Sequence, residues 1–369
     1  MKILVTGAKG FIGQNLIAEL NNQKYETVYE FDIDSNIKDL DKYCKECDFV
    51  FHLAGVNRPK DEKEFLEGNY GFTTILLNTL KKYKNKSPIV LSSSIQAELD
   101  NPYGVSKRAG EDVLIRYGEE TGAKVLIYRF PNVFGKWARP NYNSAVATFS
   151  HNIAHGLPIM VNDPNVVINL IYIDDVVKEL INALKGNENR QGQYCYVEPV
   201  YQVKLGEIAE LLYSFKRSRE ERSIPKLDDP FVKKLYSNYL SYLPKEDFGY
   251  DLTMHQDYRG SFTEFLKTPD RGQVSVNISK PGITKGNHWH HTKNEKFLVV
   301  YGTGVIRFRK IKTEEVIEYY VSGDKLQVID IPVGYTHNIE NLGKTDMVTI
   351  MWVNEIFDPQ NPDTIYEEV

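Results

Sequence analysis

The chain has 369 residues, and 41% of them are hydrophobic. A chain of this size can bury two separate cores, so we expect two domains. Its 45 basic and 50 acidic side chains give a net charge of -5, which leaves no broad basic surface for a nucleic-acid backbone.

Apolar runs and cysteines exclude further classes. Ile3 to Val5, the first apolar run, is too short for a signal peptide, and no later run reaches the ~18 residues of a membrane span. We therefore expect a cytoplasmic protein. Cys44, Cys47 and Cys195 are too few for a disulfide framework, and the single CxxC predicts reduced structural thiols rather than a zinc or redox site.

The first half of the chain alternates apolar β-branched runs with helical patterns. Strands are expected at residues 2–6, 27–32, 49–54, 88–93 and 124–130. Helices are expected at residues 11–22, 72–83 and 103–120, where apolar residues recur at intervals of three and four. This alternation is typical of an α/β doubly wound, Rossmann-type fold.

The second half changes character after a polar segment at residues 216–229 and a short helix predicted at 230–243. From about residue 274 onward, seven short strands follow one another at intervals of about ten residues, which indicates an all-β sandwich or barrel. The predicted domains are therefore residues 1–245 and 246–369.

A glycine-rich turn follows the first predicted strand. TGAKGFIG places Gly7, Gly10 and Gly13 where a strand ends and a helix begins, an arrangement that lets a pyrophosphate approach the backbone and the helix N-terminus. Asp32 ends the second strand 19 residues after Gly13, where a carboxylate can accept ribose hydroxyls. Asp32 would repel a 2′-phosphate and Lys9 would attract one; we favour NADP(H), and a dual preference stays open.

A tyrosine and a lysine lie four residues apart on one face of the third predicted helix. In Tyr103-Gly-Val-Ser-Lys107, the ammonium is expected to lower the phenol pKa, so that Tyr103 exchanges a proton with a carbonyl oxygen. Ser92, Ser93 and Ser94 end the preceding strand, where a hydroxyl can bind the same oxygen. Together with the glycine turn, this pattern predicts hydride transfer.

These motifs resemble the extended short-chain dehydrogenase/reductases that act on nucleotide-activated sugars. The resemblance rests on TGAKGFIG, HLAG, GNYGFTTILL, SSS, YGVSK, RFPNVFG and IYIDDVV, and it implies Ser94, Tyr103 and Lys107 as the catalytic triad. It also implies Asn132 and Arg129 at the sugar nucleotide, and a cofactor site formed by Gly7, Lys9, Gly10, Phe11, Ile12, Gly13, Asp32, Leu53, Ala54, Gly55 and Lys107. Only eight residues separate Ser94 from Tyr103, fewer than in many members of the family.

A histidine cluster marks the second domain. His288, His290, Glu295 and His337 are expected to converge from neighbouring strands on one divalent metal, because side chains alternate along a strand. His291 is expected to face away from them. Imidazole and carboxylate suit several metals, and we expect zinc because no redox step is required. Five side chains could contact a nucleotide sugar and are equally plausible as surface or core residues: Lys285, Tyr301, Arg307, Arg309 and Tyr335. The two spacings resemble the two motifs of the cupin superfamily, which are small jelly-roll barrels.

At full length the sequence resembles fused reductase–cupin enzymes of capsular polysaccharide synthesis. The resemblance implies C3 epimerisation of a UDP-2-acetamido-2,6-dideoxy-4-hexulose in the cupin. NADPH-dependent reduction of C4 would then give UDP-2-acetamido-2,6-dideoxy-L-talose, on the way to UDP-N-acetyl-L-fucosamine. It also implies zinc and a homodimer. Two alternatives stay open: a cupin with oxygenase or isomerase activity on another substrate, and a non-catalytic cupin attached to a reductase of single activity.

Overall fold

The computed structural model describes residues 1–369 and divides into two compact units. The first unit comprises Met1–Tyr213 and Leu227–Pro244, and the second comprises Ser214–Lys226 and Lys245–Val369. The predicted boundary between residues 245 and 246 compares with a long segment of the second unit that begins at Lys245, and Ser214–Lys226, predicted as part of the first domain, also belongs to the second unit. No helix combines the length and the apolar character that a membrane crossing requires.

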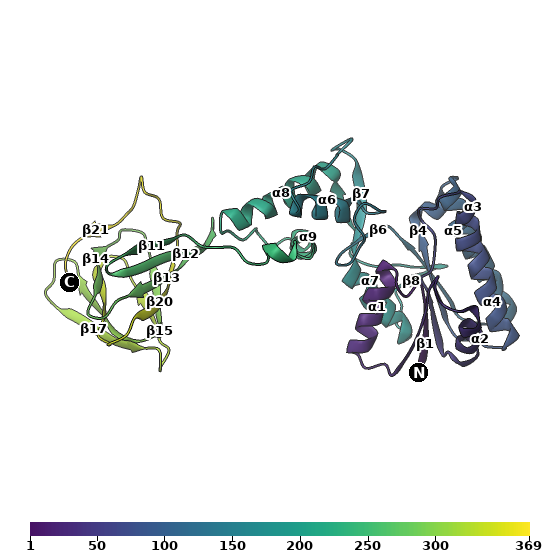
Figure 1. Cartoon of the computed structure of the whole chain (residues 1–369), viewed down its shortest axis with the longest axis horizontal. Coiled ribbons are helices and arrows are strands. Elements are labelled where there is room, and N and C mark those ends of the chain that lie inside the picture. The colour runs from purple at the N-terminus through teal and green to yellow at the C-terminus, as the bar shows by residue number, and fades with distance from the viewer. The chain divides into compact units, whose positions relative to one another are not determined.

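The first unit alternates strands and helices, and its central sheet is built from short apolar strands (Figure 1). Its elements are β1 (Lys2–Thr6), α1 (Phe11–Asn22), β2 (Thr27–Phe31), α2 (Ile37–Glu46), β3 (Phe49–His52), α3 (Lys63–Leu66), the π-helix Glu67–Gly71, α4 (Phe72–Lys82), β4 (Ile89–Ser94), the 3-10 helix Ile95–Glu98, α5 (Pro102–Thr121), β5 (Val125–Phe130), β6 (Asn132–Phe134), α6 (Ala145–Ala154), β7 (Val167–Tyr172), α7 (Ile173–Leu184), β8 (Arg190–Gln191), β9 (Tyr194–Cys195), β10 (Tyr201–Lys204) and α9 (Pro230–Leu240); α8 (Leu205–Glu220) continues into the second unit.

The central sheet has the strand order β2-β1-β3-β4-β5-β9-β8. All neighbours up to β9 are parallel, and only β8 runs antiparallel. The chain leaves β1 toward β2 and then returns to the opposite side of β1 with β3. This reversal creates a switch point at the carboxyl end of β1, the place where doubly wound sheets bind their ligands.

Helices cover both faces of this sheet, as expected for parallel strands that are apolar on both sides. Figure 1 shows α1 and α7 on one face and α2, α4 and α5 on the other. One core cluster joins the strands to α1 and α7, and a second joins them to α2, α4 and α5. Cys44 and Cys47, the cysteines predicted as structural thiols, lie buried in the second cluster as free thiols.

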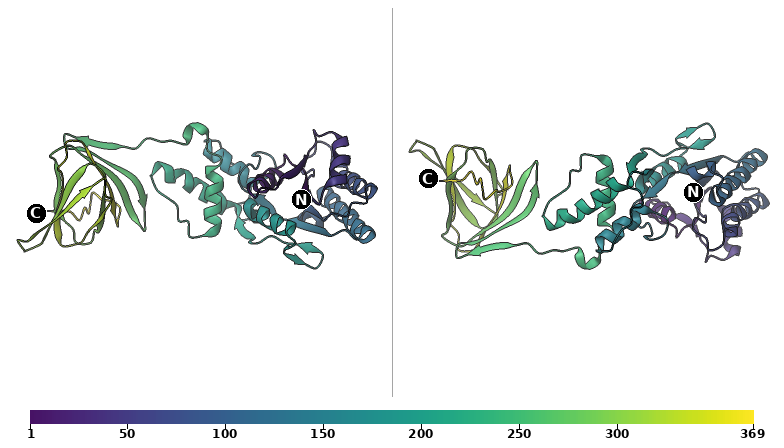
Figure 2. Two further views of the ribbon diagram at one scale, coloured as in Figure 1. Left: turned by 90° about the horizontal axis from the view of Figure 1, so that it is seen from below. Right: turned by 90° about the horizontal axis from the view of Figure 1, so that it is seen from above.

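The second unit consists of two facing antiparallel sheets (Figure 2). Its elements are the 3-10 helix Lys245–Asp247, β11 (Met254–Asp257), β12 (Gly260–Thr268), β13 (Gly272–Ser279), β14 (Thr284–Trp289), β15 (Glu295–Tyr301), β16 (Thr303–Lys310), β17 (Val316–Ser322), β18 (Val328–Ile331), β19 (Tyr335–Asn341), β20 (Met347–Val353) and β21 (Ile365–Tyr366). The sheet orders are β11-β12-β13-β20-β15-β18 and β17-β16-β19-β14-β21.

The space between these sheets contains a hydrophobic cluster and a separate region lined by polar side chains of β13. Phe297, Ile306, Phe308 and Ile339 belong to a compact hydrophobic cluster. In β13, by contrast, the buried residues are the polar ones, Gln273, Ser275, Asn277 and Ser279, whereas the valines and the isoleucine between them are partly exposed. A polar inner wall of this kind suits a ligand pocket better than a packed core.

Candidate functional sites

The glycine turn adopts a conformation that only small residues permit. A Cβ atom on Gly13 would lie 2.2 Å from the carbonyl oxygen of Gly7, closer than atoms can approach. The helix α1 begins directly after Gly10, which provides no side-chain cap. The backbone N–H groups of its first turn are therefore available to an anionic ligand.

The two charged groups predicted near the cofactor ribose lie beside this turn. The Asp32 carboxylate accepts hydrogen bonds from the backbone N–H of Lys9 at 2.7 Å and of Ile33 at 2.8 Å. The Lys9 ammonium pairs with Asp34, a residue that the sequence analysis did not identify. The site thus presents one cation and two carboxylates, and this arrangement does not by itself decide between the two nicotinamide cofactors.

A pocket of about 840 Å³ opens at the switch point of the sheet. It brings together most residues predicted for the cofactor, the reaction and the sugar: Gly7, Lys9, Gly10, Phe11, Ile12, Gly13, Asp32, Leu53, Gly55, Ser94, Tyr103, Lys107 and Asn132. Ala54 and Arg129 do not line it. Trp137, Arg139 and Tyr142 also line the pocket, although no motif in the sequence pointed to them.

Tyr103 and Lys107 lie on one face of α5, next to the end of β4. The Lys107 ammonium donates to the backbone oxygen of Ser92 at 3.0 Å and lies 5.9 Å from the centre of the Tyr103 ring. Burial lowers the pKa of Lys107 to about 8, against the opposing charge of Glu111.

The expected direction of the Tyr103 pKa shift is wrong. Burial raises the pKa of this phenol, and a hydrogen bond with Ser94 only partly opposes the increase. The desolvation of the phenolate is thus larger than the stabilisation that the sequence analysis attributed to Lys107. A raised pKa keeps Tyr103 protonated at neutral pH, which suits a group that donates a proton during reduction.

Arg129 belongs to a buried ion pair behind the triad. Its guanidinium donates to both carboxylate oxygens of Glu111, with the shortest distance 2.6 Å, and to Glu98 at 3.1 Å. Glu111 also accepts from the Ser93 hydroxyl at 2.5 Å and is 1% exposed. The contact between Arg129 and a substrate stays a prediction, because the guanidinium already donates to Glu111 and Glu98. No motif marks Glu111 in the sequence, because only the fold brings α5 and β5 together.

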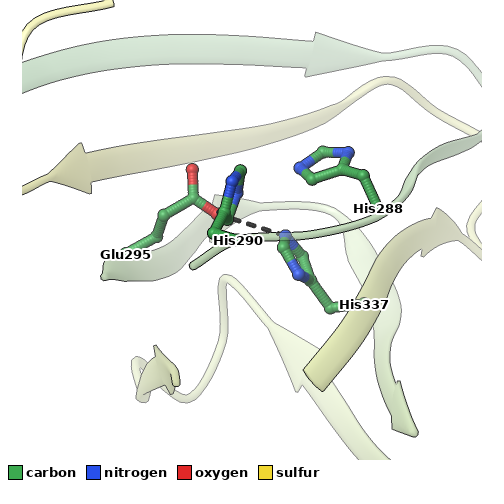
Figure 3. A group of neighbouring side chains, drawn as sticks. All are labelled: His288, His290, Glu295 and His337. Atoms are coloured by element: carbon green, nitrogen blue, oxygen red, sulfur yellow. Dashed lines mark ion pairs between the residues drawn. The ribbon is translucent and has the colours of Figure 1, made fainter. Parts of the chain in front are cut away.

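The four predicted metal ligands converge between the two sheets of the second unit (Figure 3). His288, the last residue but one of β14, lies directly opposite His337 of β19, Glu295 begins β15, and His290 follows β14. Gly286 makes this register possible: it has a φ of +108°, and a Cβ atom there would lie 2.8 Å from the carbonyl oxygen of His337. His291 is exposed and packs against Trp289 instead.

The geometry and the charge of this cluster fit a divalent metal. The ligand atoms all lie within 4.8 Å of one another; Glu295 Oε2 is 3.1 Å from His337 Nε2 and 3.6 Å from His290 Nε2. Ligands around a tetrahedral zinc ion are roughly 3.3 Å apart. Both ring nitrogens of His337 and Nε2 of His290 are buried without a hydrogen-bond partner, and such atoms are costly unless they bind something.

The protonation states suit a metal as well. Burial tends to raise the pKa of Glu295, but His290 and His337 outweigh it and lower the pKa to about 2. Burial and the two neighbouring imidazoles lower the pKa of His288 to about 4. At neutral pH the cluster therefore offers an ionised carboxylate and at least one neutral imidazole, the forms that bind metals.

The cluster lies at one wall of a pocket of about 630 Å³. Residues of β11, β12 and β13 and of the turn between β11 and β12 also line this pocket, among them Asp257, Arg259 and Asn277. Asp257 pairs with Arg259 at 2.6 Å. Lys285 also lines the pocket, and its ammonium donates to Asn277 Oδ1 at 2.9 Å and to the backbone oxygen of Ile278 at 2.8 Å.

Together, the glycine turn at the switch point and the Tyr103–Lys107 pair define a nucleotide-binding domain of the short-chain dehydrogenase/reductase class. Comparison with known proteins agrees. Residues 3–197 match the NAD dependent epimerase/dehydratase family, and residues 255–365 match the polysaccharide biosynthesis C-terminal domain.

Several relatives match over nearly the whole chain. A UDP-2-acetamido-2,6-beta-L-arabino-hexul-4-ose reductase from Pseudomonas aeruginosa is 46% identical over 99% of this chain and 98% of its own length. The crystal structure of the capsular polysaccharide assembling protein CapF from Staphylococcus aureus is 59% identical, with complete coverage of both chains and a TM-score of 0.96. CapF with the inhibitor 3-isopropenyl-tropolone is 54% identical, again with complete coverage, and has a TM-score of 0.90.

The chain therefore belongs to the NAD dependent epimerase/dehydratase family, and within it to the CapF-type proteins that carry a second, all-β domain. This confirms the doubly wound first domain and the cupin-like antiparallel second domain.

Proposed function

We propose that the chain is a bifunctional enzyme of capsular polysaccharide synthesis that acts on a UDP-activated 4-keto-6-deoxy amino sugar. The second unit epimerises C3 of UDP-2-acetamido-2,6-dideoxy-4-hexulose, and the first unit reduces the C4 ketone to give UDP-2-acetamido-2,6-dideoxy-L-talose. The observation that carries this proposal is that Tyr103, Lys107 and the glycine turn line one pocket, in a chain that is 46% identical to a reductase of a UDP-hexul-4-ose.

The reduction needs a hydride at C4 and a proton at O4. The nicotinamide supplies the hydride when it is bound. Tyr103 donates the proton to O4, and the Ser94 hydroxyl hydrogen-bonds the same oxygen as negative charge develops on it. Lys107 places its charge between the tyrosine and the end of β4. Asn132, which lines the pocket, contacts the sugar nucleotide.

NADPH is the proposed reductant. Lys9 lies within the glycine turn, near the expected position of the ribose. Its ammonium is exposed and pairs with Asp34. A 2′-phosphate would compete with Asp34 for this ammonium. The Asp32 carboxylate can accept the ribose hydroxyls of NADH, but it would repel the 2′-phosphate of NADPH and so reduce the preference for NADPH.

The second unit is proposed to hold zinc on His288, His290, Glu295 and His337. Held by these four residues, the metal would supply a Lewis acid for the ketone, and the C3 proton would become more acidic. Lys285 is proposed as the base that removes this proton, and a proton from solvent then returns to the opposite face of C3, which inverts its configuration. Burial lowers the pKa of Lys285. A neutral amine can still donate to Asn277 Oδ1 and to the backbone oxygen of Ile278, and it keeps a lone pair that can accept a proton.

The experiment separates the two reactions. Full-length Tyr103→Phe protein is incubated without NADPH in D2O with the UDP-4-keto sugar, and the ring protons are followed by NMR. Deuterium at C3, absent in a His337→Ala control, supports epimerisation in the second unit before reduction. No exchange in zinc-loaded protein would leave the alternative, a reductase of single activity with a non-catalytic metal-binding module.

Two further predictions from the resemblance accompany this proposal: the chain forms a homodimer, and it acts in the cytoplasm. Light scattering coupled to size-exclusion chromatography measures the first, and fractionation of the source cells measures the second.

A further inference from the structure

One carboxylate holds the loop between two of the proposed metal ligands. The loop, residues 291–294, joins His290 to Glu295. The side chain of Asp363 accepts hydrogen bonds from three successive backbone N–H groups of this loop, those of His291, Thr292 and Lys293, at 3.0, 2.9 and 3.2 Å. It also accepts from the Thr292 hydroxyl at 2.9 Å. A loop with four bonds to one carboxylate is fixed against the segment that carries Asp363.

The backbone of Asp363 acts on a ligand directly. Its carbonyl oxygen lies 2.5 Å from Nδ1 of His290. A carbonyl oxygen can only accept, so Nδ1 of His290 carries the hydrogen and Nε2 carries the lone pair. That Nε2 atom is buried, has no hydrogen-bond partner, and faces Glu295. The contact therefore selects the tautomer that leaves Nε2 ready to bind a metal.

The residues around Asp363 form a strap, residues 362–368, along the strands that carry the other histidines. In β21, Tyr366 pairs with His288 and Ile365 pairs with Trp289. The backbone oxygen of Glu367 accepts from the hydroxyl of Thr336, the residue before His337. The backbone N–H of Glu367 donates to the backbone oxygen of Asn287 at 3.1 Å. The strap thus touches each of the three segments that present a histidine.

Asp363 occupies an unusual backbone position for this purpose. Its φ is +37°, in the left-handed region, which an aspartate or asparagine tolerates better than most residues and a glycine tolerates best. This local cost is offset by the hydrogen bonds of the side chain and the carbonyl.

We propose that Asp363 is a positioning residue of the metal centre: its carbonyl sets the tautomer of His290, and its carboxylate holds the loop between His290 and Glu295. This inference rests on the proposed function, because it assumes that the cluster binds zinc. Removing such a partner of a metal ligand typically weakens metal binding about 10- to 100-fold.

The test compares three variants of the full-length chain. Asp363→Gly keeps the backbone conformation and removes the carboxylate, Asp363→Asn keeps one acceptor oxygen, and Asp358→Ala is the matched control. Asp358 lies in the same region and accepts only from Gln360 and Asn361. Zinc affinity is measured by competition with a chromophoric chelator. We expect the Gly variant to bind zinc about 10- to 100-fold more weakly, the Asn variant to recover most of the affinity, and the control to match the unsubstituted chain.

A second measurement needs no metal. Nitrogen-15 NMR of histidine-labelled, metal-free protein at pH 8.5 reports which ring nitrogen of His290 carries the hydrogen, with the signal assigned by its loss in His290→Asn. We expect Nδ1–H in the unsubstituted chain and also in Asp363→Gly, because a glycine that keeps the backbone conformation also keeps the carbonyl that accepts from Nδ1.

Either of two results would overturn the inference: Nε2–H on His290 in the unsubstituted chain, or a Gly variant whose zinc affinity stays within about twofold of normal. The tautomer in the unsubstituted chain decides the matter even where the Gly variant fails to fold. An unsubstituted chain that binds no zinc would instead refute the proposed metal centre. The tautomer measurement is made without metal, so it tests the contact between Asp363 and His290 separately.

Discussion

Replacing Lys107 by methionine should remove the reductase activity and stabilise the first unit at neutral pH. Burial lowers the pKa of Lys107 from 10.5 to about 8. Each unit of pKa shift corresponds to about 1.4 kcal/mol, so the buried charge costs roughly 3 kcal/mol, and we take about 2 kcal/mol because the side chain keeps some exposure. Losing the bond to the Ser92 oxygen costs about 1 kcal/mol, which leaves a net gain of about 1 kcal/mol.

The pH dependence makes this prediction specific. Between pH 8 and 10.5 the unfolded chain binds more protons at Lys107 than the folded chain does, so the stability of the unsubstituted chain rises with pH in this window. Below pH 8 the full penalty is present. The advantage of Lys107→Met is therefore largest at pH 7 and falls by about 2 kcal/mol as the pH approaches 10.5.

Calorimetry measures this difference. The transition of the first unit is recognised by its shift when NADPH is added, and a gain of about 1 kcal/mol raises its Tm by roughly 2–4 °C at pH 7. Lys82→Met, at an exposed lysine paired with Asp41, serves as the control and should gain nothing. A Lys107 variant that is less stable at pH 7, or an advantage that does not change with pH, would refute the reasoning.

Further predictions concern the two sites. Gly13→Ala should abolish NADPH binding in a fluorescence titration because its Cβ would lie 2.2 Å from the Gly7 oxygen, whereas Gly249→Ala, with no atom within 4 Å, should not. Lys9→Ala should weaken NADPH binding about tenfold and leave NADH binding nearly unchanged; equal losses would exclude a contact between Lys9 and the 2′-phosphate. Chelation of zinc should destabilise the second unit by about 3 kcal/mol relative to protein in zinc at 100 times its Kd, and calorimetry should show no shift of the first unit. Mixed Tyr103→Phe and His337→Ala proteins should together restore product formation if the epimerised intermediate is released, and mass spectrometry of the mixture should detect none if it stays bound.

The parts of the fold that local sequence determines were predicted well. The helix at residues 11–22 has the bounds of α1, because a glycine turn before it and an amphipathic pattern within it fix both its start and its length. The convergence of the four candidate metal ligands was also predicted, from two spacings that resemble the cupin motifs and from the alternation along a strand that places His288 and His290 on one side. Their convergence with Glu295 and His337 confirms the geometry that this spacing predicts.

The parts that depend on distant contacts were not predicted. The strands β11 and β12 carry polar and charged residues and lack the apolar alternation of a half-buried strand, although they supply a wall of the pocket that contains the metal cluster. Asp363 lies 73 residues from His290. A single aspartate in a polar segment has no pattern that marks it as a partner of a histidine, so only the folded structure could identify it.

The two proposed reactions fit one chain because the second removes the group on which the first depends. The C3 proton is acidic only while C4 is a ketone, so epimerisation alone gives an equilibrium mixture, and reduction of C4 makes the configuration at C3 permanent. Each pocket draws its residues from one unit only, Gly7 to Ser144 for the reductase and Met254 to Met351 for the metal centre. On this proposal the reductase needs to discriminate between the two C3 epimers of the ketone. Trp137, Arg139 and Tyr142, which line its pocket without belonging to a motif, are candidates for this role beside Asn132, since the glycine turn is proposed to bind the cofactor and the triad to contact O4.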